Sequence, residues 1–255
     1  MSDKVLVTTD GPVGTIAINR PAVRNAVDNE TAAALTAAFR TFDRDDTLRV
    51  AVLTGAGGHF CAGADLKALA AGQDYQPWAG DRDGPCHDRL SKPLIAAIAG
   101  YACAGGLGLA LRCDLRVAEE GATFAVLSRR FGVPMSDGTT VRLPRIVGLG
   151  RALDMLLTGR KVTAAEAQAI GLVDRLVAPG QALAAAQALA RQIAGFPQIA
   201  MRSDRQSALR QFDLPEAEAI ELEMQLAAAA RRLEAQAGAA RFAAGAGRHG
   251  QIPEQ

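Results

Sequence analysis

Two glycine-containing segments each follow a short apolar run and precede a possible helix, and both could bind an oxyanion. The first is GGHFCAGADL at residues 57–66, and the second is GYACAGGLG at residues 100–108. Amide groups at the start of a helix are free to donate, and the helix dipole favours negative charge there. Two such turns side by side could donate one N–H each to a developing enolate or tetrahedral oxyanion. Either turn alone is more often plain chain geometry, so the hypothesis depends on the pair.

Other chemistry-bearing motifs are missing from the sequence. The dinucleotide fingerprint fails because Phe60 stands at the position of its third glycine, and neither a P-loop nor a G-x-S-x-G nucleophile elbow occurs. The histidines His59, His87 and His249 are too scattered for a zinc motif, so no metal site is predicted. Cys61 and Cys103 fit buried small thiols better than nucleophiles.

The elements that must position these turns follow a repeated order of strand, glycine turn and helix. We expect strands at residues 5–9, 15–19, 49–54, 93–99 and 114–118, a helix from 28 or 29 to about 43, and a turn at 100–104 before a helix at 105–111. Repeats of this kind predict an α/β fold with functional groups where strands meet helices. Segment 72–85, rich in Gly, Asp and Pro, is predicted to be a mobile surface loop.

From residue 150 onward the pattern is helical. Thr163 and Glu166 form a capping box, helices are expected at 181–194 and 199–211, and Pro215 is expected in the first turn of a helix at 216–239. The tail at 245–255 is expected to fray. We therefore divide the chain into a core at 1–195 and a helical C-terminal region at 196–255.

Composition excludes several classes of function. Lys plus Arg number 28 and Asp plus Glu 27, so no attraction to nucleic acid or to an acidic membrane follows. Residues 94–111 are uncharged, but their glycines and alanines fit a buried strand and helix better than a membrane span. The N-terminus lacks a signal-peptide pattern and the four cysteines form no C-x-x-C pair, so a reduced, cytoplasmic protein is expected.

Several spaced motifs together resemble the enoyl-CoA hydratase/isomerase (crotonase) superfamily, in order from about residue 5 to residue 180. They are NRP at 19–21 with Asn25 and Ala26, FCAGADLK at 60–67, KPLIAA at 92–97, GYA at 100–102 with Gly105 and Gly106, CD at 113–114, LPR at 143–145, LTGR at 157–160, AAEA at 164–167 and GLV at 171–173.

The resemblance implies a fold, a ligand and an assembly. The fold would be a crotonase-like spiral of repeated ββα turns with a helical C-terminal part that mediates trimer formation, and two trimers would build a hexamer. The substrate would be a coenzyme A thioester, with no separate cofactor. The two oxyanion donors of the family map onto the amides of Ala62 and Gly105. The CoA path would run along Arg24 to Ala26 and along Ala64, Asp65 and Leu66, although Asp65 could equally be a helix cap.

The sequence departs from the family where hydratase chemistry should lie. Hydratases use two glutamates, and the corresponding positions here are Gly108 and Ser128. Neither residue can act as a carboxylate acid or base. Water addition should therefore be very slow, and restoring glutamate at both positions should recover some of it.

Asp137 is then the candidate acid/base residue, because the resemblance places an acidic residue of the isomerases in this loop. Its alternative role is to cap the helix expected near 139–146, and the two roles are compatible. The favoured function is isomerisation or another reaction that needs a single carboxylate. An acyl-CoA-binding protein with vestigial catalysis and a thioester hydrolase remain as alternatives.

Overall fold

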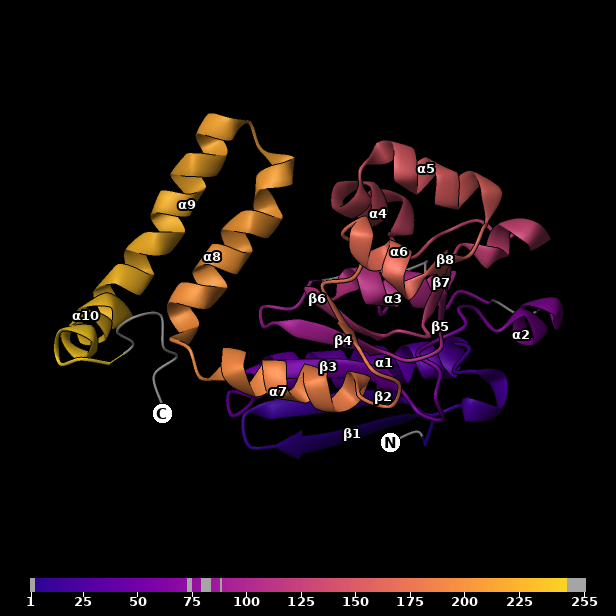
Figure 1. The fold of residues 1–255 in the computed structure, drawn as a ribbon, viewed down its shortest axis with the longest axis horizontal. Coiled ribbons are helices and arrows are strands. Elements are labelled where there is room, and N and C mark those ends of the chain that lie inside the picture. The colour runs from indigo at the N-terminus through magenta and orange to yellow at the C-terminus, as the bar shows by residue number, and fades with distance from the viewer. Residues whose placement is uncertain (1–2, 73–74, 79–83, 88, 247–255) are drawn as a thin grey trace. The chain divides into compact units, whose positions relative to one another are not determined.

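The computed structural model describes residues 3–72, 75–78, 84–87 and 89–246. The chain divides into two compact units, Met1–Arg191 and Gln192–Gln255. The division falls within a helix, whereas the sequence placed the boundary after Gly195. The α/β fold class with a helical C-terminal part is confirmed (Figure 1).

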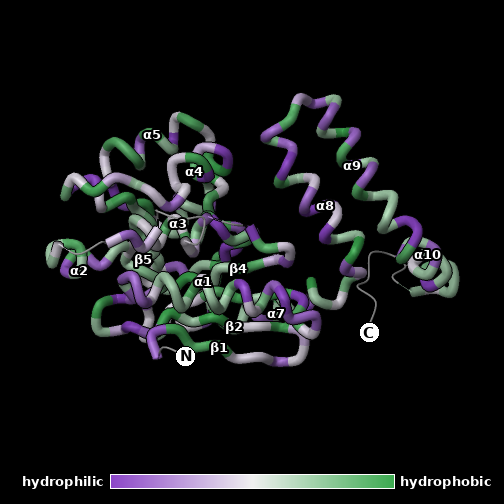
Figure 2. Tube along the Cα trace, turned by 180° about the vertical axis from the view of Figure 1, so that it is seen from behind, coloured by the Kyte–Doolittle hydropathy of each residue, from purple (hydrophilic) through white to green (hydrophobic). Residues whose placement is uncertain are grey.

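The first unit is built on a six-stranded sheet in the order β1-β2-β3-β4-β6-β9. Only β1 and β2 are antiparallel within it, and they form the predicted hairpin. The strands are β1 Val5–Asp10, β2 Val13–Ile18, β3 Val50–Gly55, β4 Leu94–Ile98, β6 Leu115–Glu119 and β9 Arg175–Val177. Every residue of β4 is buried, and the apolar runs of β2 and β4 can be followed in Figure 2.

A second, small sheet corrects one expectation. Residues 100–104 were expected to be a turn, but Tyr101–Cys103 forms β5, which pairs in parallel with β7, Thr123–Ala125. The two-residue β8, Val162–Thr163, pairs with β7 in the antiparallel sense. Three residues show no alternation that a sequence pattern could detect, so this strand depends on its distant partner.

The helices of the first unit lie close to the predicted ranges. They are α1 Asn29–Arg44, α2 Leu66–Ala70, α3 Gly105–Arg112, α4 Thr139–Val147, α5 Leu149–Thr158, α6 Ala164–Ala169 and α7 Ala182–Ala194, with 3-10 turns at Pro21–Val23 and Leu127–Phe131. The predicted capping residue Thr163 accepts a hydrogen bond from the amide of Glu166. Asp28 caps α1 by accepting from the amide of Thr31.

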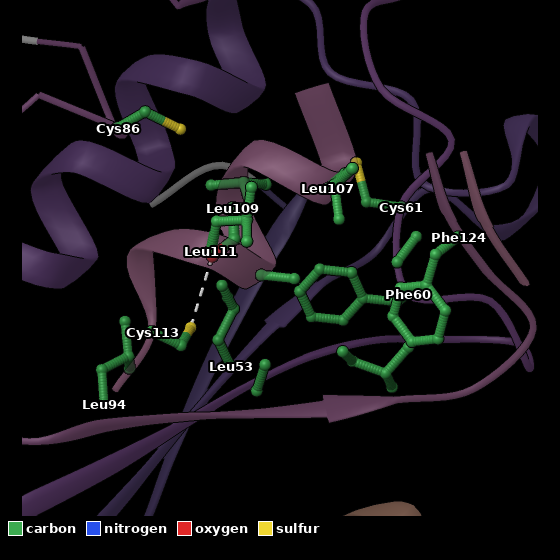
Figure 3. Close-up of a cluster of buried hydrophobic side chains, with 14 of the residues drawn as sticks. Leu53, Phe60, Cys61, Cys86, Leu94, Leu107, Leu109, Leu111, Cys113 and Phe124 are labelled. Atoms are coloured by element: carbon green, nitrogen blue, oxygen red, sulfur yellow. Dashed lines mark hydrogen bonds between the residues drawn. The ribbon is translucent and has the colours of Figure 1, made fainter. Parts of the chain in front are cut away.

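Helix α3 lies in the middle of the core and has no solvent-facing side. All its residues are buried, and its leucines pack among aromatic and aliphatic side chains from both sheets (Figure 3). Phe60, Phe124 and Leu107 are fully buried there. Because close packing leaves little room for displacement, the start of α3 is held firmly in place.

The second unit is helical. It holds α8 Gln198–Arg210, a 3-10 turn at Gln211–Asp213, α9 Glu216–Ala230, a π-helical turn at Arg231–Ala235 and α10 Gln236–Ala243. The helix predicted at 216–239 is thus interrupted by a π turn. The Glu234 carboxylate caps α8, because it accepts from the amides of Ile199 at 3.0 Å and Ala200 at 2.8 Å. Of the tail expected to fray, residues 247–255 lie outside the described part of the chain.

Candidate active site

The two glycine-containing turns lie side by side, as the sequence hypothesis requires. The amide of Cys61 donates to the carbonyl of Tyr101 at 2.8 Å, and the amide of Cys103 donates to Cys61 at 3.0 Å. A Cβ atom on Gly63 would lie only 3.0 Å from the amide nitrogen of Gly105. Glycine at position 63, with φ of 100°, is what allows the loop to approach the start of α3 so closely.

The amide of Ala62 is already engaged and does not face this junction. It donates to the carbonyl of Arg24 at 3.0 Å. Arg24 and Asn25 both have left-handed backbones, with φ of 52° and 58°. The Asn25 side chain holds that bend by donating to the carbonyls of Ala56 and His59 at 2.8 and 2.6 Å. The structure therefore corrects the expectation that Ala62 offers a free N–H.

The amides of Ala64 and Gly105 take its place. Among the residues that the structure describes, neither amide donates to a protein acceptor. Both residues line one cavity of about 350 Å³ in the first unit. Apolar side chains make up most of the wall, which consists of Ala64, Leu69, Tyr75, Gln76, Pro77, Trp78, Ala104, Gly105, Ser128, Gly132, Val133, Pro134, Met135, Ser136 and Asp137. An acyl group fits such surroundings better than a charged one.

Asp137 brings a carboxyl group into this apolar wall. The residue is 2% exposed, and its Oδ1 accepts from the amide of Thr139 at 2.9 Å. Arg142 donates to the backbone carbonyl of Asp137 at 3.0 Å. Burial raises the pKa of the Asp137 carboxyl above its ordinary value, against the opposing effects of the Thr139 hydrogen bonds and the Arg142 charge. A carboxyl of this kind can exchange a proton nearer to neutral pH than an exposed aspartate can.

The expected capping role of Asp137 is partly met. The N-cap of α4 is Gly138, which has a left-handed φ of 84° and no side chain to donate or accept. Asp137, one residue earlier, accepts instead from the first amide of the helix. Asp137 therefore supports α4 and also lines the cavity.

The two positions that differ from the hydratase pattern both adjoin Asp137. Ser128 lines the same cavity, and its hydroxyl contacts Met135 Sδ at 3.3 Å. Gly108 lies directly beneath the carboxyl, since a Cβ atom there would be 2.4 Å from Asp137 Cγ. A side chain restored at 108 would therefore meet the Asp137 carboxyl, so the rescue expected from the sequence requires that carboxyl to move.

Trp78 is a wall residue that sequence reasoning missed. It is 7% exposed, and a Cβ atom on Gly105 would lie 2.4 Å from its ring. The indole thus covers the first residue of α3. Trp78 belongs to the segment at 72–85 that was expected to be mobile, and within that segment residues 73–74 and 79–83 lie outside the described part. A single tryptophan in a polar loop could have signalled a buried contact.

The residues expected along the CoA path are placed as follows. Asp65 caps α2 by accepting from the amides of Lys67 and Ala68, and it pairs with Arg20 at 3.0 Å. The Arg24 guanidinium lies 5.3 Å from the ring centre of Tyr101. Ala26 is buried, and Leu66 is 39% exposed. Asp65 is thus committed to holding the start of α2, which is the alternative that the sequence left open.

No set of three or more His, Cys, Asp or Glu side chains among the described residues is grouped so that it could hold a metal ion. None of the helices in the described ranges is both long and apolar enough to cross a membrane.

Comparison with known proteins defines the family. Residues 8–245 match the enoyl-CoA hydratase/isomerase family. The enoyl-CoA hydratase EchA19 of Mycobacterium tuberculosis is 38% identical over 228 residues, which cover 87% of this chain and 86% of that protein. The carnitinyl-CoA dehydratase of Salmonella arizonae is 41% identical over 198 residues, covering 76% and 75%.

Solved structures agree with this result. The crystal structure of the enoyl-CoA hydratase EchA1 from Mycobacterium marinum superposes with a TM-score of 0.90 at 34% identity, covering 99% of this chain and 98% of that one. The chain belongs to the enoyl-CoA hydratase/isomerase family and has the crotonase fold.

Proposed function

We propose that this protein is an acyl-CoA isomerase that moves a double bond by means of one carboxylate, Asp137. The observation that supports this most is the composition of the cavity. It joins two amides without protein acceptors, at Ala64 and Gly105, to a single buried carboxyl group in an apolar wall. Family membership supports a thioester of coenzyme A as the ligand, with no further cofactor.

The proposed step balances without any other reactant. The Asp137 carboxylate takes a proton from the α carbon of a 3-enoyl thioester, and the electron pair passes to the thioester oxygen. The amides of Ala64 and Gly105 donate hydrogen bonds to the resulting dienolate oxygen. Asp137 then returns the proton to the γ carbon, the electrons flow back, and a 2-enoyl thioester remains.

Hydration would need more than this site supplies. Water addition requires one group to deprotonate the water and another to protonate the carbon, whereas positions 108 and 128 hold Gly and Ser. The Ser128 hydroxyl contacts the thioether sulfur of Met135, and an unassisted hydroxyl is not a base near neutral pH. We therefore expect very slow hydration of crotonyl-CoA despite the names of the relatives.

A panel of acyl-CoA substrates, with products identified by mass spectrometry and chromatography, tests the proposal. A product of unchanged mass and altered retention time from a 3-enoyl-CoA is expected. Gain of water, loss of carbon dioxide, or release of free coenzyme A as the main outcome would contradict it. Tight binding without any product would favour the acyl-CoA-binding alternative instead.

We also propose that the chain assembles as a trimer or a dimer of trimers in the cytoplasm. Large apolar side chains are exposed on the C-terminal helices, including Ile220, Met224, Leu233 and Phe242 at 51% to 65%. A surface of this kind is typical of an interface. All four cysteines are free thiols, which fits a reducing compartment. Light scattering that shows only monomer at micromolar concentration would contradict the assembly.

A further inference from the structure

The backbone of Gly108 lies directly against the carboxyl group of Asp137. A Cβ atom built on Gly108 would be 2.4 Å from Asp137 Cγ, 2.6 Å from its Oδ2 and 2.9 Å from its Cβ. Real Cβ atoms essentially never lie this close to another atom, so one of the two groups would have to shift. The space that a side chain at position 108 would need is therefore filled by the carboxyl that comes from the loop before α4.

The Asp137 side chain is also held in that space from the other side. Its Oδ1 binds the amide of Thr139 at 2.9 Å, and Arg142 ties the Asp137 carbonyl to the carbonyl of Cys86 by donating to them at 3.0 and 2.7 Å. Moving the carboxyl away from α3 would break its bond to a buried amide, which then loses its partner. A side chain at 108 thus displaces the Asp137 carboxyl at the cost of its hydrogen bond to Thr139.

We propose that Gly108 is a positioning residue, whose missing side chain holds the Asp137 carboxyl at the cavity. Gly108 is three residues after Gly105 on α3, so the two lie on neighbouring turns of one face of the helix, about 5 Å apart. Asp137, whose carboxyl rests on Gly108, lines the same cavity as Gly105. This inference rests on the proposed function, in which that amide and that carboxyl act on one thioester.

Glycine at position 108 is accordingly a requirement of the site. The chain can hold a carboxylate from position 137 or a side chain at position 108, and the two exclude each other. Glycine at position 108, where a hydratase has its first glutamate, and the buried carboxyl of Asp137 therefore depend on each other.

The first test compares Gly108→Ala with Gly150→Ala. Gly150 is a matched control, because it lies in α5 and a Cβ atom there meets nothing within 4 Å. Gly108→Ala should lower kcat for isomerisation at least tenfold with KM little changed. The displaced carboxyl is better hydrated, so the acidic limb of the pH–rate profile should move to lower pH. Gly150→Ala should change neither. Wild-type kcat and an unmoved acidic limb in Gly108→Ala would overturn the proposal.

The second test separates this contact from catalysis. Thermal unfolding is measured for wild type, Gly108→Ala, Asp137→Gly and the double variant. Gly108→Ala should lower Tm in the wild-type background and should not lower it when Asp137 is already Gly, because all three Asp137 atoms that a Cβ at 108 would meet are then absent. An equal loss of Tm in both backgrounds would overturn the inference, even if Gly108→Ala alone folds poorly. Full turnover by Asp137→Asn would refute the proposed function and leave this cycle unaffected.

Discussion

The two sides of the cavity are built from different parts of the chain. On one side, the proposed oxyanion donors are backbone amides of Ala64 and Gly105, placed where the loop after β3 meets the start of α3. On the other side, the acid/base candidate is one side chain, Asp137, from the loop before α4. The first side is fixed by the fold itself, whereas the second depends on individual residues. A substitution at position 137 can therefore change the reaction without moving the amides of Ala64 and Gly105.

The largest expected effect comes from removing the carboxylate alone. Asp137→Asn should lower isomerisation by about 10²- to 10⁴-fold, the range expected for loss of a general acid/base. Affinity for the CoA thioester should stay nearly unchanged, because it depends on the other side of the cavity. Stopped-flow or mass-spectrometric rates and calorimetric binding check the two quantities. Asn retains an acceptor oxygen for the amide of Thr139, so the variant should fold.

A second prediction exchanges one carboxylate arrangement for the other. Gly108→Glu with Ser128→Glu should give no gain in crotonyl-CoA hydration while Asp137 is present, because the new side chain at 108 meets its carboxyl. Adding Asp137→Gly should open that space and allow measurable hydration. Absorbance at the wavelength of the conjugated thioester follows the reaction. Brisk hydration by the unmodified chain would show that another residue performs it.

A third prediction concerns pH. Burial raises the pKa of Asp137, so the active carboxylate is lost at a higher pH than for an exposed aspartate. The acidic limb of kcat/KM should lie above the ordinary range near 3.8.

The same shift predicts how stability depends on pH. The folded state binds the proton of the Asp137 carboxyl more tightly than the unfolded chain does. The stability that this proton contributes is therefore present at low pH and is lost as the pH rises through the raised pKa. Relative to Asp137→Asn, the free energy of unfolding of the wild type should therefore decrease over that range. Denaturant titrations at several pH values measure this. If the difference in free energy of unfolding between wild type and Asp137→Asn stays constant with pH, the raised pKa of Asp137 is contradicted.

The smallest effect is expected at Asp65. Asp65→Ala removes the cap of α2 and the pair with Arg20, at a cost of about 0.5–2 kcal/mol. Asp65→Asn keeps a capping oxygen and should cost less. Chemical denaturation measures both. If Asp65→Asn keeps full stability but loses CoA affinity, the residue also contacts the ligand directly.

Local signals explain why much of the fold could be predicted from the sequence. The Thr163 cap of α6, the hairpin and the helices all depend on neighbours within a few residues. The short strand β5 depends on a partner about twenty residues away and was missed for that reason.

The site was harder to predict because its key contacts are long-range. Whether an amide in FCAGAD is free depends on the left-handed bend at Arg24, which brings a carbonyl to Ala62. The contact between Gly108 and Asp137 joins residues from different elements, and a glycine gives no sign of what fills its missing side chain. Family resemblance brought these residues into view, but their geometry came only from the folded chain.

The central claim is that Asp137 moves a proton between carbons of an unsaturated thioester without adding water. The most direct measurement incubates a 3-enoyl-CoA with the protein in D₂O and records the mass and double-bond position of the product, with Asp137→Asn as control. A 2-enoyl-CoA without added water, formed by wild type and not by Asp137→Asn, with deuterium entering on repeated turnover, is predicted. A hydroxyacyl-CoA as the product, or equal isomerisation by the variant, would contradict the account.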